Sequence, residues 1–356
     1  MNSRLQRLQA VFEQHQIQAL LVTKPENRLY LSGFTGSAGA LVLTREQSVL
    51  FTDFRYIEQA TKQAPQFEVI RHGQDFWASV AAWLNSQGIE RLGFESDFLT
   101  VEFYDKFKKI APLLILCPVK LDELRQVKDE AEQALLIKAV QIADQAFQQI
   151  LPAIRVGVTE MEVAVELEYH MRQLGSAKPA FDTIAASGVR GSLPHGLASS
   201  RPIEAGDFIT LDFGAVYEGY HSDMTRTVCV GKASDKQKEL YQIVLAAQLA
   251  GVAAIKSGIA CNEVDAAARR VIKAAGYGEF FGHGLGHSVG LAIHEEPRFS
   301  PTCATVLAEN MVLSVEPGIY LPDFGGVRIE DLVVVSDTGC KVLTASSKEL
   351  IELDCN

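Results

Sequence analysis

Hydrophobic residues in the first 120 positions recur with two periods. Stretches in which they return every third or fourth position predict helices, and short runs rich in Val, Ile, Leu and Phe predict strands. The expected helices are 4–15, 53–63, 76–86 and 101–110, and the expected strands are 19–23, 40–44, 48–52, 67–71, 91–95 and 113–117. Because the two kinds of element alternate with short connections, a smaller α/β layer domain is expected. Asp53 is expected to cap the helix that follows it, and a patch presented to another molecule is the alternative.

A change of pattern near residue 120 marks a domain boundary. A Pro-containing segment, 117–121, precedes a charged helix that is expected to open near Leu124 and to run to about residue 150. Further helices are expected at 160–175, 235–256 and 261–275. We therefore predict two domains, 1–122 and 123–356. The second is expected to be α+β, with helices covering an antiparallel sheet.

The segment 206–227, GDFITLDFGAVYEGYHSDMTRT, has the alternation of a β-hairpin. Its two arms carry Asp212 and Asp223. A turn centred between Tyr217 and Glu218 would set these acids directly opposite each other. A turn centred one residue later would set them on a diagonal, still close across the strand pair. Because neighbouring carboxylates repel each other, a divalent cation is the simplest compensation.

A second segment, 310–320 (NMVLSVEPGIY), repeats the pattern of 206–216 at a constant offset of 104 positions. Under this offset Glu316 corresponds to Asp212, and the strand that follows carries Glu330. A hairpin with one acid on each arm therefore occurs twice. This indicates a domain in which an antiparallel hairpin is duplicated about a pseudo-twofold axis. The alternative is that two hairpins of the same period look alike by chance.

Between the hairpins lies a glycine-rich segment with three histidines, 282–295 (GHGLGHSVGLAIHE). Its four glycines disfavour a regular helix, so His283 and His287 are not expected to form a helical metal-binding pair. A loop or bulged strand that aims an imidazole into a cavity suits the sequence better. One such histidine and the four acids of the hairpins are a suitable set of ligands for two divalent transition-metal ions that share carboxylates. Each residue alone is more often structural or solvent-facing, and only the joint pattern indicates a site.

Composition narrows the class of protein. The 356 residues carry a net charge of −11 with a pI near 5.3, which disfavours nucleic acid or an anionic membrane as a partner. The N-terminal segment lacks the apolar core of a signal peptide, and no stretch approaches the roughly 18 apolar residues of a membrane span. Six cysteines without CxxC spacing favour reduced thiols. A cytoplasmic protein is expected.

Four motifs, LDFGAVYEGYHSDMTRT, HGLGHSVGLAIHE, VEPGIY and GVRIED, resemble those of the pita-bread metallopeptidases, most closely proline dipeptidase (prolidase) and aminopeptidase P. In the N-terminal half, NRLYLSGFTGSAG and TDFRYIEQA resemble the small bacterial X-Pro peptidases. The resemblance covers nearly the whole chain. It implies a pita-bread (creatinase/methionine aminopeptidase-like) catalytic domain and a creatinase-like N-terminal domain.

The resemblance also implies roles for individual residues. The residues that would hold two divalent ions are Asp212, Asp223, His287, Glu316 and Glu330, with Asp223 and Glu330 as bridges. Mn²⁺ or Co²⁺ is the first expectation, and Zn²⁺ or Fe²⁺ the alternative. The residues that would contact the substrate are His195, His294 and Arg298, and those that would support the ligands are His283, Tyr320, Arg328 and Asp331. Of these, His195, His294 and Arg328 would form the catalytic set together with Glu316.

The expected function is that of an Xaa-Pro dipeptidase acting on proline-containing dipeptides or short peptides. The two metals would lower the pKa of a bridging water, and the resulting hydroxide would attack the scissile carbonyl while Glu316 takes the proton. His195 and His294 would donate hydrogen bonds to the developing oxyanion. Arg298 matches an arginine that several prolidases are proposed to use for the free carboxylate of the substrate. A homodimer is expected by analogy.

Three other functions are weighed against this one. An Xaa-Pro aminopeptidase, which acts on longer peptides, is the main alternative. Methionine aminopeptidase shares the five ligands, but an N-terminal domain of about 120 residues argues against it. A metal-free peptide-binding module of the same fold is disfavoured because no expected ligand is missing.

Overall fold

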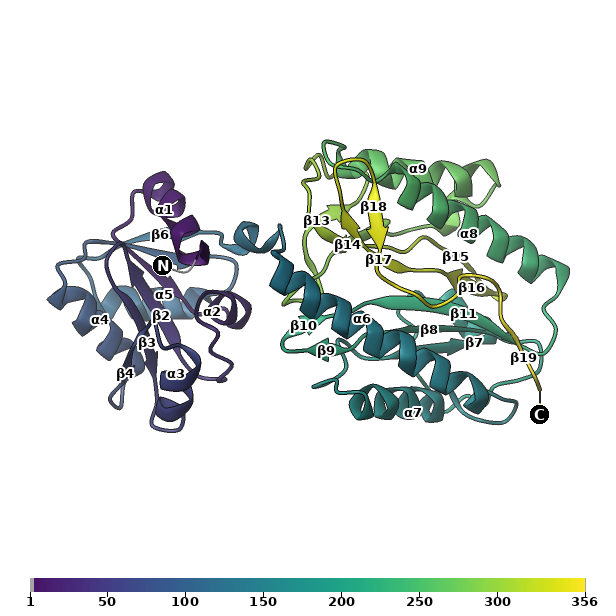
Figure 1. Ribbon diagram of the computed structural model, residues 1–356, viewed down its shortest axis with the longest axis horizontal. Coiled ribbons are helices and arrows are strands. Elements are labelled where there is room, and N and C mark those ends of the chain that lie inside the picture. Colours follow the sequence, from purple (N-terminus) through teal and green to yellow (C-terminus); the bar gives the residue numbers. More distant parts are fainter. Residues whose placement is uncertain (1–2, 356) are drawn as a thin grey trace. The chain divides into compact units, whose positions relative to one another are not determined.

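The computed structural model describes residues 3–355, and the chain divides into two compact units, 1–125 and 126–356. The first unit is built on one mixed sheet with strand order β4-β3-β2-β1-β5-β6 (Figure 1). Its strands are β1 (Ala19–Val22), β2 (Ala40–Thr44), β3 (Ser48–Thr52), β4 (Glu68–Arg71), β5 (Arg91–Glu95) and β6 (Ile115–Val119). Its helices are α1 (Ser3–His15), α2 (Pro25–Ser32), α3 (Ile57–Gln63), α4 (Phe76–Ser86), α5 (Val101–Ile110) and the 3₁₀ turn η1 (Asp122–Arg125). The expected α/β layer domain is thereby confirmed.

Two details of the first unit differ from expectation. Helix α2 was not expected, and its N-terminus is closed by the buried carboxylate of Glu95, which accepts hydrogen bonds from the backbone amides of Thr23 (2.6 Å) and Lys24 (2.8 Å). The capping role expected for Asp53 is wrong. Helix α3 starts at Ile57, and Asp53 instead binds the backbone amide and guanidinium of Arg55.

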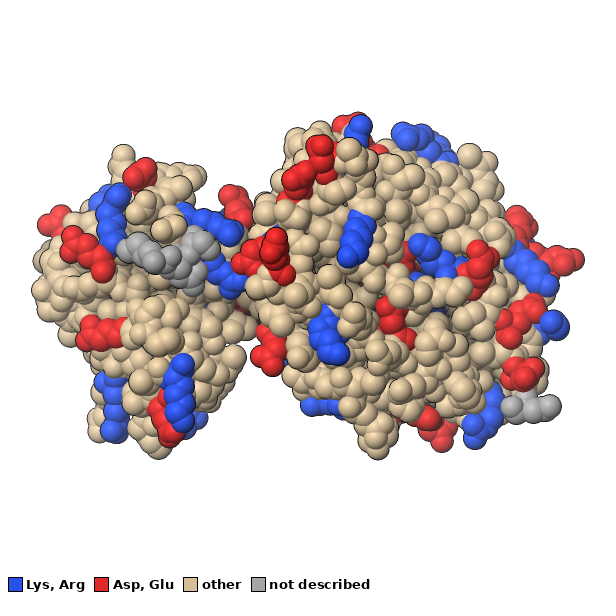
Figure 2. All heavy atoms as spheres, viewed as in Figure 1, with Lys and Arg blue, Asp and Glu red and all other residues tan. Residues whose placement is uncertain are grey.

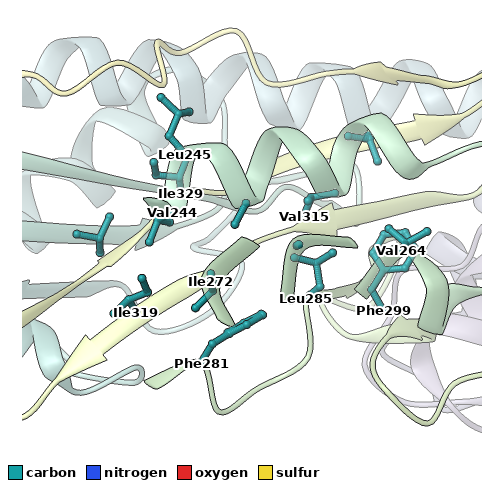
Figure 3. Close-up of a cluster of buried hydrophobic side chains, with 14 of the residues drawn as sticks. Val244, Leu245, Val264, Ile272, Phe281, Leu285, Phe299, Val315, Ile319 and Ile329 are labelled. Atoms are coloured by element: carbon teal, nitrogen blue, oxygen red, sulfur yellow. The ribbon is translucent and has the colours of Figure 1, made fainter. Parts of the chain in front are cut away.

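The second unit contains two larger sheets, each covered by a pair of helices (Figure 1). One sheet has the order β19-β11-β8-β7 and packs against α6 and α7 through a shared apolar core. The other has the order β13-β12-β14-β17-β18 and packs against α8 and α9. Figure 3 shows this second core, in which Val244 and Leu245 of α8 and Val264 of α9 lie with side chains from strands such as Val315.

The helices of the second unit are α6 (Glu130–Ile150), η2 (Leu151–Ala153), α7 (Glu160–Gln173), η3 (Gly188–Ser192), α8 (Asp235–Ala254), α9 (Cys261–Ala274) and η4 (Gly278–Phe280). Its strands are β7 (Ile184–Ser187), β8 (Phe208–Phe213), β9 (Val216–Tyr217), β10 (Tyr220–His221), β11 (Met224–Val230), β12 (Gly286–Ser288), β13 (Glu295–Phe299), β14 (Val312–Val315), β15 (Gly318–Leu321), β16 (Gly325–Arg328), β17 (Asp331–Val335), β18 (Cys340–Val342) and β19 (Glu352–Leu353). Helix α6 begins later than expected because Asp129 and Glu132 form a capping box.

The strand register of each hairpin determines whether its two acids lie directly opposite each other or on a diagonal. Strand β11 places Thr225 opposite Asp212 in β8, and Glu218 and Gly219, both with positive φ, form the turn. Asp223 therefore lies on the diagonal from Asp212, the second of the two arrangements expected. In the other hairpin the pairs Val315–Asp331 and Gly318–Arg328 flank Glu316 and Glu330, which face each other directly.

The segment 282–295 contributes strands rather than a helix. Strand β12 carries His287 and pairs with β13 through a register shift between His287 and Ser288. The expected bulged strand is confirmed. Figure 2 shows acidic and basic side chains interspersed over the visible faces. Among residues 3–355, none of the helices has the length and apolar character needed to cross a bilayer.

Candidate active site

A cavity of about 630 Å³ in the second unit collects nearly all residues that the sequence singles out. The predicted residues along its wall are His195, Asp212, Asp223, His283, His287, His294, Arg298, Glu316, Tyr320, Arg328 and Glu330. They come from both hairpins, from the bulged strand and from the segment that follows β7. The duplicated fold therefore supplies the cavity with acids from two separate stretches of the chain.

Three carboxylates form the centre of this group. Asp212, Asp223 and Glu330 each offer an oxygen, and these oxygens lie within 4.8 Å of one another. Nε2 of His287 lies 3.5 Å from Oδ2 of Asp223 and 3.4 Å from Oε1 of Glu316. The five residues predicted to bind metal are thus brought together.

The electrostatics of the cluster are unfavourable without a cation. Burial, followed by the charges of neighbouring carboxylates, raises the pKa of Asp223 and of Glu330 well above its usual value. Burial also raises the pKa of Glu316 to about 8, although the nearby Arg328 opposes the shift. Oδ1 of Asp212 and Oε1 of Glu330 are buried with no hydrogen-bond partner among the described residues. Buried, mutually repelling oxygens with open lone pairs fit a divalent cation.

The orientation of His287 suits the same purpose. Its Nδ1 lies 3.1 Å from the backbone carbonyl of Ser288, so this nitrogen carries the proton and donates it. The lone pair of Nε2 then faces Asp223 and Glu316. Burial, with His294 as the next cause, lowers the pKa of His287 to about 3, which keeps the imidazole neutral. A neutral imidazole with a fixed tautomer is the form that binds metal.

A chain of hydrogen bonds supports Asp212. Arg328 donates from Nη2 to Oδ2 of Asp212 (2.6 Å) and from Nη1 to the hydroxyl of Tyr320 (2.8 Å). The Tyr320 hydroxyl lies 2.9 Å from Nε2 of His283, whose Nδ1 lies 2.8 Å from the carbonyl of Gly284. Burial opposes the charge on Arg328, but Tyr320, Asp212 and Glu316 outweigh it and raise the pKa of this guanidinium.

Asp331 lies in a different environment from the other predicted residues. Its buried carboxylate accepts hydrogen bonds from Arg226 (2.7 Å), Gln248 (2.9 Å) and Lys348 (2.6 Å). Arg226 also donates to the backbone carbonyl of Glu330. The geometry therefore links Asp331 to the acid cluster through Arg226 and the main chain.

The three residues predicted to contact substrate lie at the exposed side of the cavity. His195, His294 and Arg298 are all exposed. The ring of His294 packs edge-on against that of His287, with centroids 4.4 Å apart. The guanidinium of Arg298 pairs with Glu296 at 3.2 Å.

Sequence reasoning missed several polar partners of the cluster. The hydroxyl of Thr225 donates to Oε2 of Glu330 (2.7 Å), and that of Ser314 donates to Oε1 of Glu316 (3.2 Å). Thr225 could have been found from the second register considered for the hairpin, which sets it opposite Asp212. Phe181 and Asp182 also line the cavity, and their segment was not singled out.

The model of metallopeptidase family M24 matches residues 134–337, which include all five predicted ligands and the whole acid cluster. The chain belongs to metallopeptidase family M24. Residues 4–127 match the Creatinase/Prolidase N-terminal domain. The expected two-domain architecture with a pita-bread catalytic domain is confirmed, and the chain is a metallopeptidase of a family that uses divalent metal ions.

Similar proteins cover the chain almost completely. The Xaa-Pro dipeptidase of Pyrococcus horikoshii is 41% identical over 355 residues, which are 99% of each chain. The structure of the Xaa-Pro dipeptidase from Bacillus anthracis is 47% identical, has a TM-score of 0.96 and covers 99% of each chain. The structure of the X-Pro aminopeptidase from Thermotoga maritima is 38% identical, has a TM-score of 0.92 and covers 98% of this chain and 100% of the other.

Proposed function

We propose that this metallopeptidase is an Xaa-Pro dipeptidase that works with two divalent metal ions. The observation that carries the proposal is the convergence of the five predicted ligands on one cavity. The chain that builds this cavity is 41% and 47% identical to two Xaa-Pro dipeptidases along its whole length.

The residues present fit two cations rather than one. Four carboxylates and one neutral imidazole carry more negative charge than a single divalent ion offsets. Asp212, Asp223, His287, Glu316 and Glu330 would hold the ions. Oxygen and imidazole donors without a thiolate suit Mn²⁺ or Co²⁺, and Zn²⁺ or Fe²⁺ are the alternatives. When bound, the ions would supply Lewis acidity and lower the pKa of a water, so that it can lose a proton and act as a nucleophile at neutral pH.

The chain's own residues would do the remaining work. Glu316, once ionised, would accept the proton that leaves the attacking water. His195 and His294, which face the same cavity, would donate hydrogen bonds where oxyanion charge develops. Each such donor contributes about 2–4 kcal/mol in comparable sites. Arg328 would keep the carboxylate of Asp212 in place.

The exposed wall of the cavity suits a small dipolar substrate. Arg298 would bind the free carboxylate of the dipeptide, for which it must leave its partner Glu296. Both of these side chains are more than half exposed, so the pair is weak and its exchange costs little.

The alternative is an Xaa-Pro aminopeptidase, which the likeness to the Thermotoga maritima enzyme supports. A dipeptidase must bind the carboxylate that directly follows proline, whereas an aminopeptidase accepts a chain that continues beyond it. The deciding assay offers the purified chain, with Mn²⁺ or Co²⁺, an X-Pro dipeptide, a longer X-Pro peptide and a Met-Ala peptide. Cleavage of the dipeptide supports the proposal. Cleavage of the longer X-Pro peptide alone overturns it in favour of the aminopeptidase, and no cleavage with metal bound refutes the X-Pro activity.

We further propose a homodimer in the cytoplasm. All six cysteines are free thiols in the structure, which suits a reducing compartment. The dimer rests on the family resemblance alone and is tested by light scattering of the purified chain.

A further inference from the structure

Glu160 is a fully buried acid that lies outside the acid cluster. It occupies the first turn of α7, and its side chain is 0% exposed. An ionised carboxylate at such a position is costly unless donors surround it. Five donors do so here, and all of them belong to the stretch 187–199, which we call the His195 segment.

The two oxygens of Glu160 hold opposite ends of the His195 segment. Oε1 accepts from the backbone amide and the hydroxyl of Ser187, both at 2.7 Å. Oε2 accepts from the amide (3.1 Å) and hydroxyl (2.6 Å) of Ser199 and from the guanidinium of Arg190. Arg190 also donates to the carbonyl of Leu197, two residues after His195 (2.9 Å). One carboxylate therefore closes a loop of chain whose exposed part carries His195.

The helix itself does not need this carboxylate. Thr159 and Glu162 form a complete capping box at the start of α7. Glu160 contributes at most a favourable charge at the helix N-terminus, which an exposed acid would do equally well. Its burial and its five donors point to the His195 segment as the reason for its position.

The other side of the segment meets the acid cluster. Arg328 donates from Nη1 to the carbonyl of Pro194, the residue before His195 (3.2 Å), while its Nη2 binds Asp212. The His195 segment is therefore held between Glu160 on the helix side and Arg328 on the metal side.

We propose that Glu160 is the positioning residue for His195, which it holds at the cavity by closing both ends of the His195 segment. The proposal rests on the proposed function, in which His195 contacts the reacting carbonyl. A glutamine at this position offers one acceptor oxygen and an NH₂ group that donates, so it can hold one end of the segment but not both.

The first test needs no substrate. Hydrogen–deuterium exchange is measured on the Mn²⁺-loaded Glu160→Gln chain, on the wild type and on Glu162→Gln, the matched control that keeps the capping box. We expect the amides of 188–199 to exchange about tenfold faster in Glu160→Gln alone, with α9 unchanged in every variant. Equal exchange of the segment in all three chains overturns the proposal, and this holds whether or not the chain cleaves X-Pro bonds.

The second test separates positioning from general stability. We expect Glu160→Gln to lower kcat by about 10- to 100-fold with little change in KM, and Glu162→Gln to leave both unchanged. In a His195→Ala background the same substitution should cost nothing further, because its effect passes through His195. Additive losses in the double variant overturn the positioning role. If Glu160→Gln does not fold, Ser199→Ala, which removes one donor at one end, is judged by the same two measurements.

Discussion

Replacing Arg328 by lysine tests whether a rigid guanidinium holds the metal site together. The fork of Arg328 donates to Asp212 (2.6 Å), Tyr320 (2.8 Å), Thr225 (3.0 Å) and the carbonyl of Pro194 (3.2 Å). A lysine ammonium keeps the charge and the contact with Asp212, but as a single point of charge it cannot reproduce the fork.

The expected loss follows from these contacts. Three of the four hydrogen bonds are lost. Because a hydrogen bond to a charged group is worth about 1.5–3 kcal/mol, the free energy of unfolding should fall by about 4.5–9 kcal/mol. Since Asp212 also loses its fixed orientation, the affinity for Mn²⁺ should fall by about 10- to 100-fold. Urea unfolding of the metal-free chain and calorimetric titration with Mn²⁺ measure the two effects.

The matched control is Arg270→Lys, an exposed arginine on α9. It should change the free energy of unfolding by no more than about 0.5 kcal/mol. If Arg328→Lys is as mild as this control and binds Mn²⁺ with the affinity of the wild type, the role assigned to the fork is refuted.

Three further predictions concern the protons and donors of the site. Burial and the nearby Asp212 raise the pKa of Glu316 to about 8 in the metal-free chain, so the site holds protons that a cation must displace. The affinity for Mn²⁺ should therefore rise with pH between about 6 and 8, with proton release seen by calorimetry in buffers of different ionisation enthalpy. An affinity that does not change with pH would contradict this. Glu316→Ala should fold, as judged by circular dichroism, but lack turnover, and retained turnover would exclude its role as base. His195→Ala and His294→Ala should each lower kcat by about 10²- to 10³-fold while Mn²⁺ stoichiometry stays constant, and a loss of bound metal would instead assign them to the ligand set.

The sequence predicted those elements whose hydrophobic pattern matches their burial. Strands β2, β3 and β5 and helices α4 and α5 have the expected bounds because their apolar faces meet the core of the first unit. Helix α2 was not predicted because its buried face includes Asn27, Arg28 and Ser32, polar residues whose side chains form hydrogen bonds. Hydrophobic periodicity cannot detect such a helix.

Hydrogen-bond partners that are distant in sequence could not be predicted either. Glu316 was found because duplication repeats Asp212 at an offset of 104 positions, and Glu330 because it lies on the strand that follows. Glu160 has the sequence context of an ordinary acid in the first turn of a helix, and its five donors come from residues 27 to 39 positions away. The partners of Asp331 likewise depend on tertiary packing, since Arg226 lies 105 positions before it. Local sequence carries no record of such contacts.

Five side chains of one cavity are proposed to bind two divalent ions. Crystals grown with Mn²⁺ and measured for its anomalous scattering test this directly. Two anomalous peaks are expected, both bound by members of the set Asp212, Asp223, His287, Glu316 and Glu330. A single peak, or peaks bound by other residues, would contradict it.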